Sequence, residues 1–260
     1  MKGTMAYPDD VIPIGEGFWN LRGSFRIGPV DIGTQASLVA LEGGGHVLLD
    51  GCKLSDEGQG WLDDATDGGA SLKGVLHLHP FHTVFVRRVH ERYPNVPLFG
   101  TKRHHLKATD LPWDELTTAD PALHERFAAD LSFSVPPGVH FIPENESLHF
   151  ASVLAFHARS RTLHVDDTLM AIRMPWLLRW WKQDIIRFHP TLKKVLQERE
   201  GAASEFRDWA EDIVARCADV TNLCAAHSAA LRSDEPLQPR VAKALAKVEG
   251  HLSAHEQKHG

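Results

Sequence analysis

Hydrophobic positions in the first part of the chain occur in short runs that are typical of β-strands. Residues 17–27, 36–42 and 46–50 are rich in aromatic, aliphatic and β-branched side chains, and glycine-containing turns separate these runs. The pattern predicts a meander of antiparallel strands.

Helices alternate with strands in the next part of the chain. Residues 57–67 predict a short helix, residues 72–78 a buried strand, and residues 83–93 a helix that ends before Pro94. A looser repeat of helix, three strands and a mostly helical region follows at 121–131, 139–142, 152–157, 161–165 and from Pro175 onward. This succession predicts an α/β protein, a four-layer αββα sandwich of two mixed sheets flanked by helices.

The chain is long enough for one domain with a full core, since 43% of its 260 residues are hydrophobic. We expect that domain at residues 1–235 and a helical, solvated tail at 236–260. The formal net charge of −6, with scattered basic residues, argues against a nucleic-acid partner. No run approaches the roughly 20 apolar residues of a membrane span, and residues 1–10 lack the apolar segment of a secretion signal.

Cysteine usage indicates a reducing compartment. The three cysteines, Cys52, Cys217 and Cys224, form an odd set without a CxxC pair, which does not suit a disulfide framework. We therefore expect a cytoplasmic protein.

Histidine is the unusual component, with 17 copies, and three of them stand together in the stretch GVLHLHPFHT at residues 74–83. Alternation along an extended strand places His77 and His79 on the same side, and Pro80 then turns the chain so that His82 returns towards them. Imidazoles that converge at about 2.0–2.1 Å from one centre suit zinc or a similar ion. A lone histidine is more often a core or loop residue, but three at a strand end favour a metal site.

Two further strand ends carry candidate ligands. Asp166 and Asp167 directly follow the β-prone run 161–165, where a carboxylate either faces a cleft or caps a turn or helix. His227 closes the short apolar run 222–226. A composite site needs ligands that are spread over several sheet-forming segments in this way.

Together these motifs resemble the metallo-β-lactamase superfamily, whose metal motif is HxHxDH followed by a distant histidine, an aspartate after a strand and a late histidine. SLVALEGGGHVLLDG resembles the opening hairpin with its strand-end Asp50, and SRTLHVDD resembles the strand that delivers the bridging Asp167, with Asp166 at the usual glycine position. GVLHLHPFH resembles the metal motif, and AAHSAAL resembles the segment of the late histidine. The resemblance covers residues 18–227, and RGSFRIG and DIGTQASLV are most similar to a sparsely characterised branch without an assigned reaction.

The resemblance implies a metal-dependent hydrolase that uses a metal-bound hydroxide on an ester, lactone, amide or related bond of a small molecule. It implies one or two Zn²⁺ ions, with iron or manganese as alternatives, and Asp167 and His82 as catalytic groups. The implied metal ligands are His77, His79, His82, His149, Asp167 and His227. His149 precedes Asp167 by 167 − 149 = 18 residues, a spacing that fits the family. His157 is the competitor; His149 is favoured because the ASV that follows it resembles the start of the next strand, whereas His157 falls near the turn HARSRT.

One position departs from the family motif. Phe81 stands where the motif has an aspartate that binds the second metal ion. The departure predicts a missing or weakened second metal site, or one rebuilt with Asp166, His157 or His164. It also leaves two other functions open: a di-iron redox protein, and a lactamase-like binding module without catalysis.

A tryptophan-rich stretch completes the candidate features. Trp176, Trp180 and Trp181 lie among aliphatic residues at 174–178, a pattern typical of a helix that packs on a sheet or forms a homodimer contact. The alternative is a hydrophobic lid over the metal site, in which Trp180, Trp181 and Phe81 contact the substrate.

Overall fold

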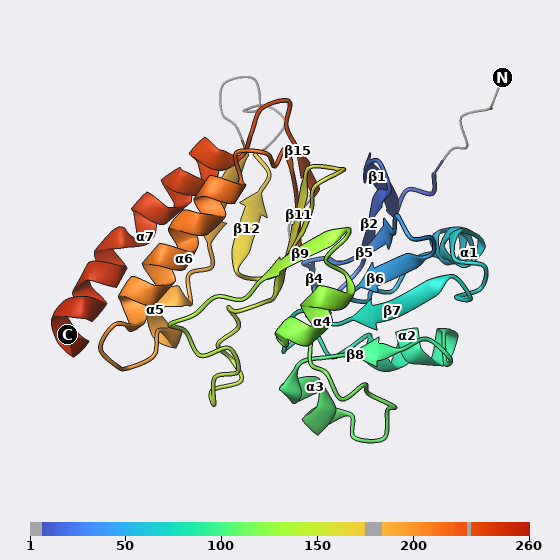
Figure 1. The fold of residues 1–260 in the computed structure, drawn as a ribbon, viewed down its shortest axis with the longest axis horizontal. Helices are drawn as coiled ribbons and strands as arrows, with labels where there is room; N and C mark the ends of the chain where they lie inside the picture. Colours follow the sequence, from blue (N-terminus) through green and yellow to red (C-terminus); the bar gives the residue numbers. More distant parts are fainter. Residues whose placement is uncertain (1–6, 175–183, 228–229) are drawn as a thin grey trace.

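Two β-sheets lie at the centre of the computed structural model, which describes residues 7–174, 184–227 and 230–260 (Figure 1). The larger sheet has the strand order β1-β2-β5-β6-β7-β8. Its strands are β1 (Val11–Gly15), β2 (Phe18–Gly23), β5 (Thr34–Ala40), β6 (His46–Leu49), β7 (Leu72–Leu76) and β8 (Leu98–Phe99). Strands β1, β2, β5 and β6 are antiparallel neighbours, whereas β6, β7 and β8 run parallel. The expected meander is therefore present and is extended by parallel strands.

The smaller sheet has the strand order β15-β14-β11-β10-β9. Its strands are β9 (Leu131–Ser134), β10 (Leu154–His157), β11 (Thr162–Val165), β14 (Asn222–Ala225) and β15 (Ala230–Arg232). Strands β11 and β14 are parallel, and the other pairs are antiparallel. Two separate hairpins are β3 (Arg26–Ile27) with β4 (Val30–Asp31), and β12 (Leu169–Ile172) with β13 (Ile185–Phe188).

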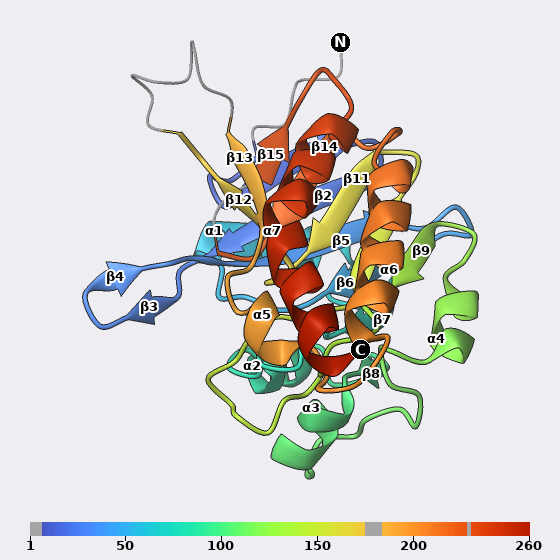
Figure 2. The same cartoon turned by 90° about the vertical axis from the view of Figure 1, so that its left-hand side faces the viewer.

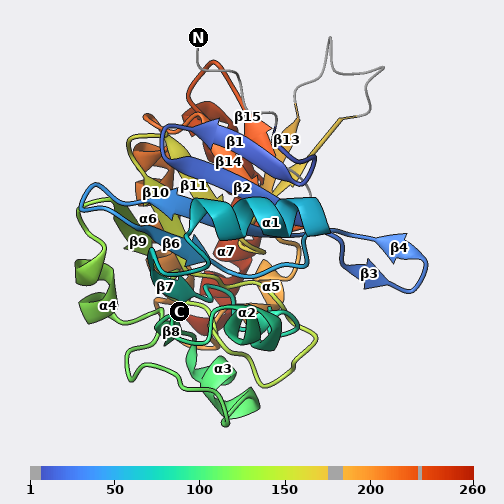
Figure 3. The ribbon, with the colours of Figure 1, turned by 90° about the vertical axis from the view of Figure 1, so that its right-hand side faces the viewer.

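The described helices lie around the two sheets. They are α1 (Asp56–Ala65), α2 (Val86–Arg92), α3 (Lys102–Lys107), α4 (Pro121–Arg126), α5 (Leu192–Val195), α6 (Ala202–Arg216) and α7 (Gln238–His259). Helix α1 lies across the larger sheet (Figure 3), and α6 and α7 lie side by side over the smaller one (Figure 2). The predicted αββα sandwich is confirmed. Within the described residues, no helix is both long and apolar enough to cross a membrane.

Alternation along the strands builds the layers. On β5, Ala36 and Leu38 pack with the core beneath α1 and α2, whereas Val39 faces the core between the sheets. On β6, Leu48 faces the first core, and Val47 and Leu49 face the second. A third core lies between the smaller sheet and helices α6 and α7. Because β5 and β6 are buried on both faces, their register is fixed.

One expected strand is absent, and the expected C-terminal helix is present but is not solvated on all sides. Residues 139–142 do not form a strand; Val139 makes one isolated bridge to Leu196. Prolines at 136, 137 and 143 flank this segment and cannot donate to a ladder, so extended pairing stops there. The segment expected to be a helical, solvated tail is helix α7, and its Leu252 side chain is fully buried against the third core.

Parallel strands position the candidate site. Strands β6 and β7 end just before Asp50 and His77, and β11 and β14 end just before Asp166 and His227. Each sheet therefore contributes the carboxyl ends of a parallel pair. The chain leaving these four ends carries most of the candidate ligands.

Candidate metal centre

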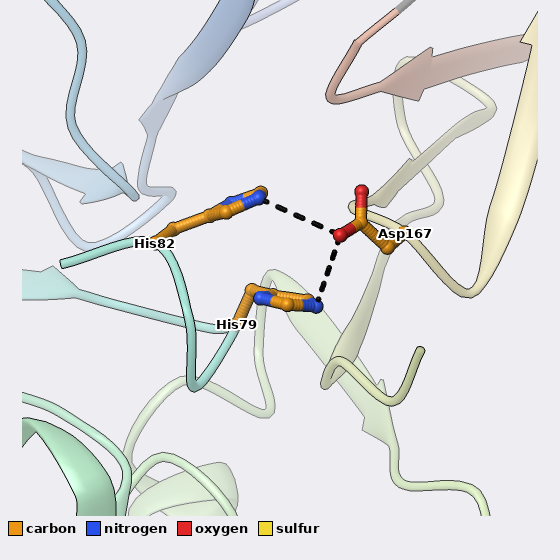
Figure 4. Close-up of side chains that lie close together, drawn as sticks. All are labelled: His79, His82 and Asp167. Carbon is orange, nitrogen blue, oxygen red and sulfur yellow. Dashed lines mark ion pairs between the residues drawn. The ribbon is translucent and has the colours of Figure 1, made fainter. Parts of the chain in front are cut away.

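Asp167 is the meeting point of four imidazoles. His79 Nε2 lies 3.4 Å and His82 Nε2 3.9 Å from Asp167 Oδ2 (Figure 4). His149 Nδ1 lies 4.0 Å from the same oxygen, and His227 Nε2 lies 3.4 Å from Oδ1. These five side chains form the outer cluster. The structure thus brings together five of the six ligands that the resemblance implies.

The electrostatics of the outer cluster favour a positive charge, and its imidazoles range from the fully buried His79 to His149, whose side chain is 43% exposed. Burial alone would raise the pKa of Asp167, but His79, His82 and His227 outweigh it and hold that pKa below its usual value. Burial, followed by the charge of His82, lowers the pKa of His79 to about 3, so its ring is neutral at neutral pH. A neutral imidazole has the free lone pair that a metal ion requires.

Unpartnered nitrogens in the outer cluster fit a metal ion. Nε2 of His79 and Nε2 of His82 are buried and have no hydrogen-bond partner among the described residues. Most buried polar atoms have a hydrogen-bond partner, so these two nitrogens keep lone pairs that a metal ion can use. Imidazole nitrogens with one carboxylate are the donors that Zn²⁺ prefers.

A sandwich of side chains orients His149. The ring of Phe81 stacks on that of His149, with 4.5 Å between centroids and 16° between planes, and the Arg103 guanidinium carbon lies 4.5 Å above the other face of Phe81. Nε2 of His149 donates to the carbonyl oxygen of Glu146 at 2.8 Å, and the Glu146 carboxylate pairs with Arg103 at 3.1 Å. Because Nε2 carries the proton, Nδ1 keeps a lone pair that can bind a metal ion beside Asp167.

The competitor His157 lies elsewhere. Its Nδ1 lies 2.7 Å from Ser160 Oγ, and its ring packs on Phe18. His157 ends β10, whereas His149 precedes that strand in an irregular segment next to Asp167. The geometry therefore favours His149.

His77 is the implied ligand that the structure does not place with the others. Its ring lies 5.3 Å from that of His104 and 6.1 Å from that of Trp113, and it is absent from the groups of described ligand atoms that lie within 4.8 Å of one another. The prediction that His77 and His79 alternate along one strand fails because β7 already ends at Leu76. Beyond that point, Leu78 N–H donates to the Asp50 side chain at Oδ1 and not to a neighbouring strand. His77 and His79 are therefore not successive outward positions of one strand.

A second group of candidate ligand atoms lies next to the outer cluster. Oxygen atoms of Asp50 and Asp166 and a ring nitrogen of His164 lie within 4.8 Å of one another, and we call these residues the inner cluster. His82 stands between the clusters, with Nδ1 3.5 Å from Asp166 Oδ1 and Nε2 facing Asp167. Burial, reinforced by Asp166, raises the pKa of Asp50 to about 6.

No protein-family model matches the sequence, and no curated protein matches it. Solved structures do match: a metallo-β-lactamase from Erythrobacter litoralis has a TM-score of 0.61 at 12% identity, covering 94% of this chain and 99% of its own. The chain has the metallo-β-lactamase fold. DIM-1 metallo-β-lactamase matches at a TM-score of 0.59 and 12% identity over 94% of this chain and 99% of its own. TMB-1 matches with a TM-score of 0.60 and 10% sequence identity. The match covers 92% of this chain and 97% of the TMB-1 chain.

Within this metallo-β-lactamase fold, a groove lies beside the outer cluster. It has a volume of about 470 Å³, and its lining includes Phe25, Phe85, Arg26 and Lys53. The Phe25 ring lies 6.3 Å from Phe85 and 6.4 Å from the ring of His227, so it connects the groove to the ligands. Trp176, Trp180 and Trp181, the predicted lid or contact residues, lie outside the described residues.

Proposed function

We propose that this protein is a metal-dependent hydrolase whose outer cluster binds Zn²⁺. The observation that carries the proposal is the convergence of four imidazoles on the Asp167 carboxylate at the shared edge of the sheets. A divalent ion held there supplies Lewis acidity, which acidifies water and polarises a carbonyl group.

The protein's own groups then have separate tasks. His79, His149 and His227 hold the ion, and Asp167 contributes the negative charge and accepts a proton at Oδ1 or Oδ2. His82 lies between the two carboxylates, with Nδ1 3.5 Å from Asp166 Oδ1 and Nε2 3.9 Å from Asp167 Oδ2, so its Nε2 is a further donor to the ion.

The groove supports a small-molecule substrate with an aryl or acyl part. Phe25 and Phe85 offer apolar contact, and Arg26 and Lys53 offer positive charge to an anionic group at the open side. Ester, lactone and amide bonds of such molecules are the proposed targets. We also propose a cytoplasmic location, which the three buried free cysteines support.

The test begins with metal analysis of protein purified without a chelating tag, followed by assays with aryl esters, lactones, phosphodiesters and β-lactams. We expect bound zinc and hydrolysis, both strongly reduced by Asp167→Asn. Asp114→Asn is the matched control, because Asp114 is a partly buried carboxylate that pairs with Arg126 away from the cluster. Bound iron with redox activity would instead support the di-iron alternative, and a zinc-loaded protein inactive on every substrate would support the binding module.

A further inference from the structure

The inner cluster holds two carboxylates in a region without water access. Asp50 and Asp166 are each 1% exposed, and His164 is 0% exposed. Transfer of an ionised carboxylate into such a region costs several kcal/mol unless a positive charge or hydrogen bonds compensate for it. Nearby positive charges or hydrogen bonds must therefore offset the cost of burying these two carboxylates.

The neighbouring groups among the described residues stabilise the two carboxylates only in part. Oδ2 of Asp166 is buried and has no hydrogen-bond partner among the described residues. The Arg22 guanidinium, a nearby cation, donates to the carbonyl oxygens of Ala225 and Ala226, at 2.8 and 3.1 Å, and to Gln35 Oε1 at 3.3 Å, rather than to either carboxylate. His82 approaches the other oxygen of Asp166 at 3.5 Å. An acceptor oxygen is thus left facing the cluster.

Surrounding groups orient the three ligands as in a metal site. Leu78 N–H donates to Asp50 Oδ1 at 2.8 Å, and His164 Nε2 donates to Asp50 Oδ2 at 3.1 Å, a hydrogen bond that a bound cation would replace. Ser37 Oγ lies 3.0 Å from the other nitrogen of His164 and fixes the ring. Gln35 Nε2 lies 3.4 Å from Asp166 Oδ1. Hydrogen bonds of this kind to the outer atoms of ligands are typical of metal centres.

We propose that Asp50, His164 and Asp166 bind a second divalent cation. This inner site takes the place of the one that the motif aspartate would serve, because the Phe81 side chain at that position has no atom that can bind a metal ion. Two carboxylates and one imidazole form a harder donor set than the outer cluster, suited to Mn²⁺, Fe²⁺ or Zn²⁺. The inference rests on the proposed metal centre for the outer ion but not on hydrolysis.

The experiment measures metal content rather than activity. Full-length, tag-free protein is stripped with chelator, saturated with Zn²⁺ or with Mn²⁺, separated from free metal and analysed by mass spectrometry, and the ions are located by anomalous diffraction. The variants are His164→Gln for the inner site and Asp167→Asn for the outer site. His157→Gln is the matched control, because His157 is an equally buried histidine whose ring contacts Ser160 and Phe18.

We expect two equivalents in the wild type and in His157→Gln, and one in each of the other variants, with an anomalous peak between Asp50 and Asp166. One equivalent in the wild type, located at Asp167 and retained in His164→Gln, overturns the inner site but leaves the proposed function intact. No bound metal overturns both. If circular dichroism shows that His164→Gln does not fold, Asp166→Asn, which keeps the side-chain shape, takes its place, and retention of two equivalents in it also overturns the inner site.

Discussion

Replacement of Phe81 by leucine tests whether its ring holds His149 towards the metal centre. The ring stacks on His149 at 4.5 Å and lies under the Arg103 guanidinium at 4.5 Å. A stacked aromatic pair and a cation–π pair together contribute about 1–3 kcal/mol. Leucine keeps the apolar volume but lacks the flat face, so we expect the free energy of unfolding to fall by that amount. We also expect zinc affinity to fall about 10-fold or more, because His149 loses one of its two supports.

The assay combines urea unfolding of the metal-free protein with calorimetric titration of zinc. Phe133→Leu is the control, because Phe133 stacks on His124 at 4.7 Å and 22°, a similar pair outside the outer cluster. It should lower stability without changing zinc affinity. If Phe81→Leu binds zinc as tightly as the wild type does, Phe81 does not position His149 and the reasoning is refuted.

Three other predictions concern stability and the ligand set. Leu252→Ala on α7 should reduce the free energy of unfolding by about 2–5 kcal/mol, because the side chain is fully buried, and an unchanged urea midpoint would contradict the packing of α7. Arg207→Gln should lower the melting temperature at neutral pH. Since Arg207 lowers the folded-state pKa values of Glu249 and Glu256, its stabilisation exists above their usual range and disappears as the pH falls through the lowered values, so melting curves of wild type and variant should converge in acid. His77→Gln should leave the zinc content unchanged, because His77 lies outside the outer cluster. Loss of zinc in this variant would show that His77 is a metal ligand after all.

The predictable part of the site consists of residues that directly follow apolar strands. Asp167 and His227 could be located because an apolar run and its end are local signals, and the αββα architecture follows from the order of such runs. His77 was assigned by the same logic, but whether a strand continues for one more residue depends on the Asp50 side chain, which comes from another strand. The local pattern of hydrophobic and polar residues cannot predict such a contact with another strand.

The inner cluster depends on contacts between sheets. His164 on β11 of the smaller sheet meets Ser37 on β5 of the larger sheet, and no sequence pattern specifies which strands face each other. The stacking of Arg103 on Phe81 is likewise a contact between α3 and a distant loop. The packing of α7 against the core could have been predicted, because its buried residues Val241, Ala244 and Leu252 follow a helical period. The polar composition of the last residues instead suggested a solvated segment.

Neither half of the chain contains a complete ligand set. His79 and His82 follow a strand of the larger sheet, whereas Asp167 and His227 follow strands of the smaller one. A cation bound between them is a cross-link that joins the two halves of the sandwich, as a disulfide would in an oxidising compartment. Metal uptake during refolding should therefore be a late event that reports when the two halves dock, and chelation should weaken the boundary between them before it affects either sheet alone.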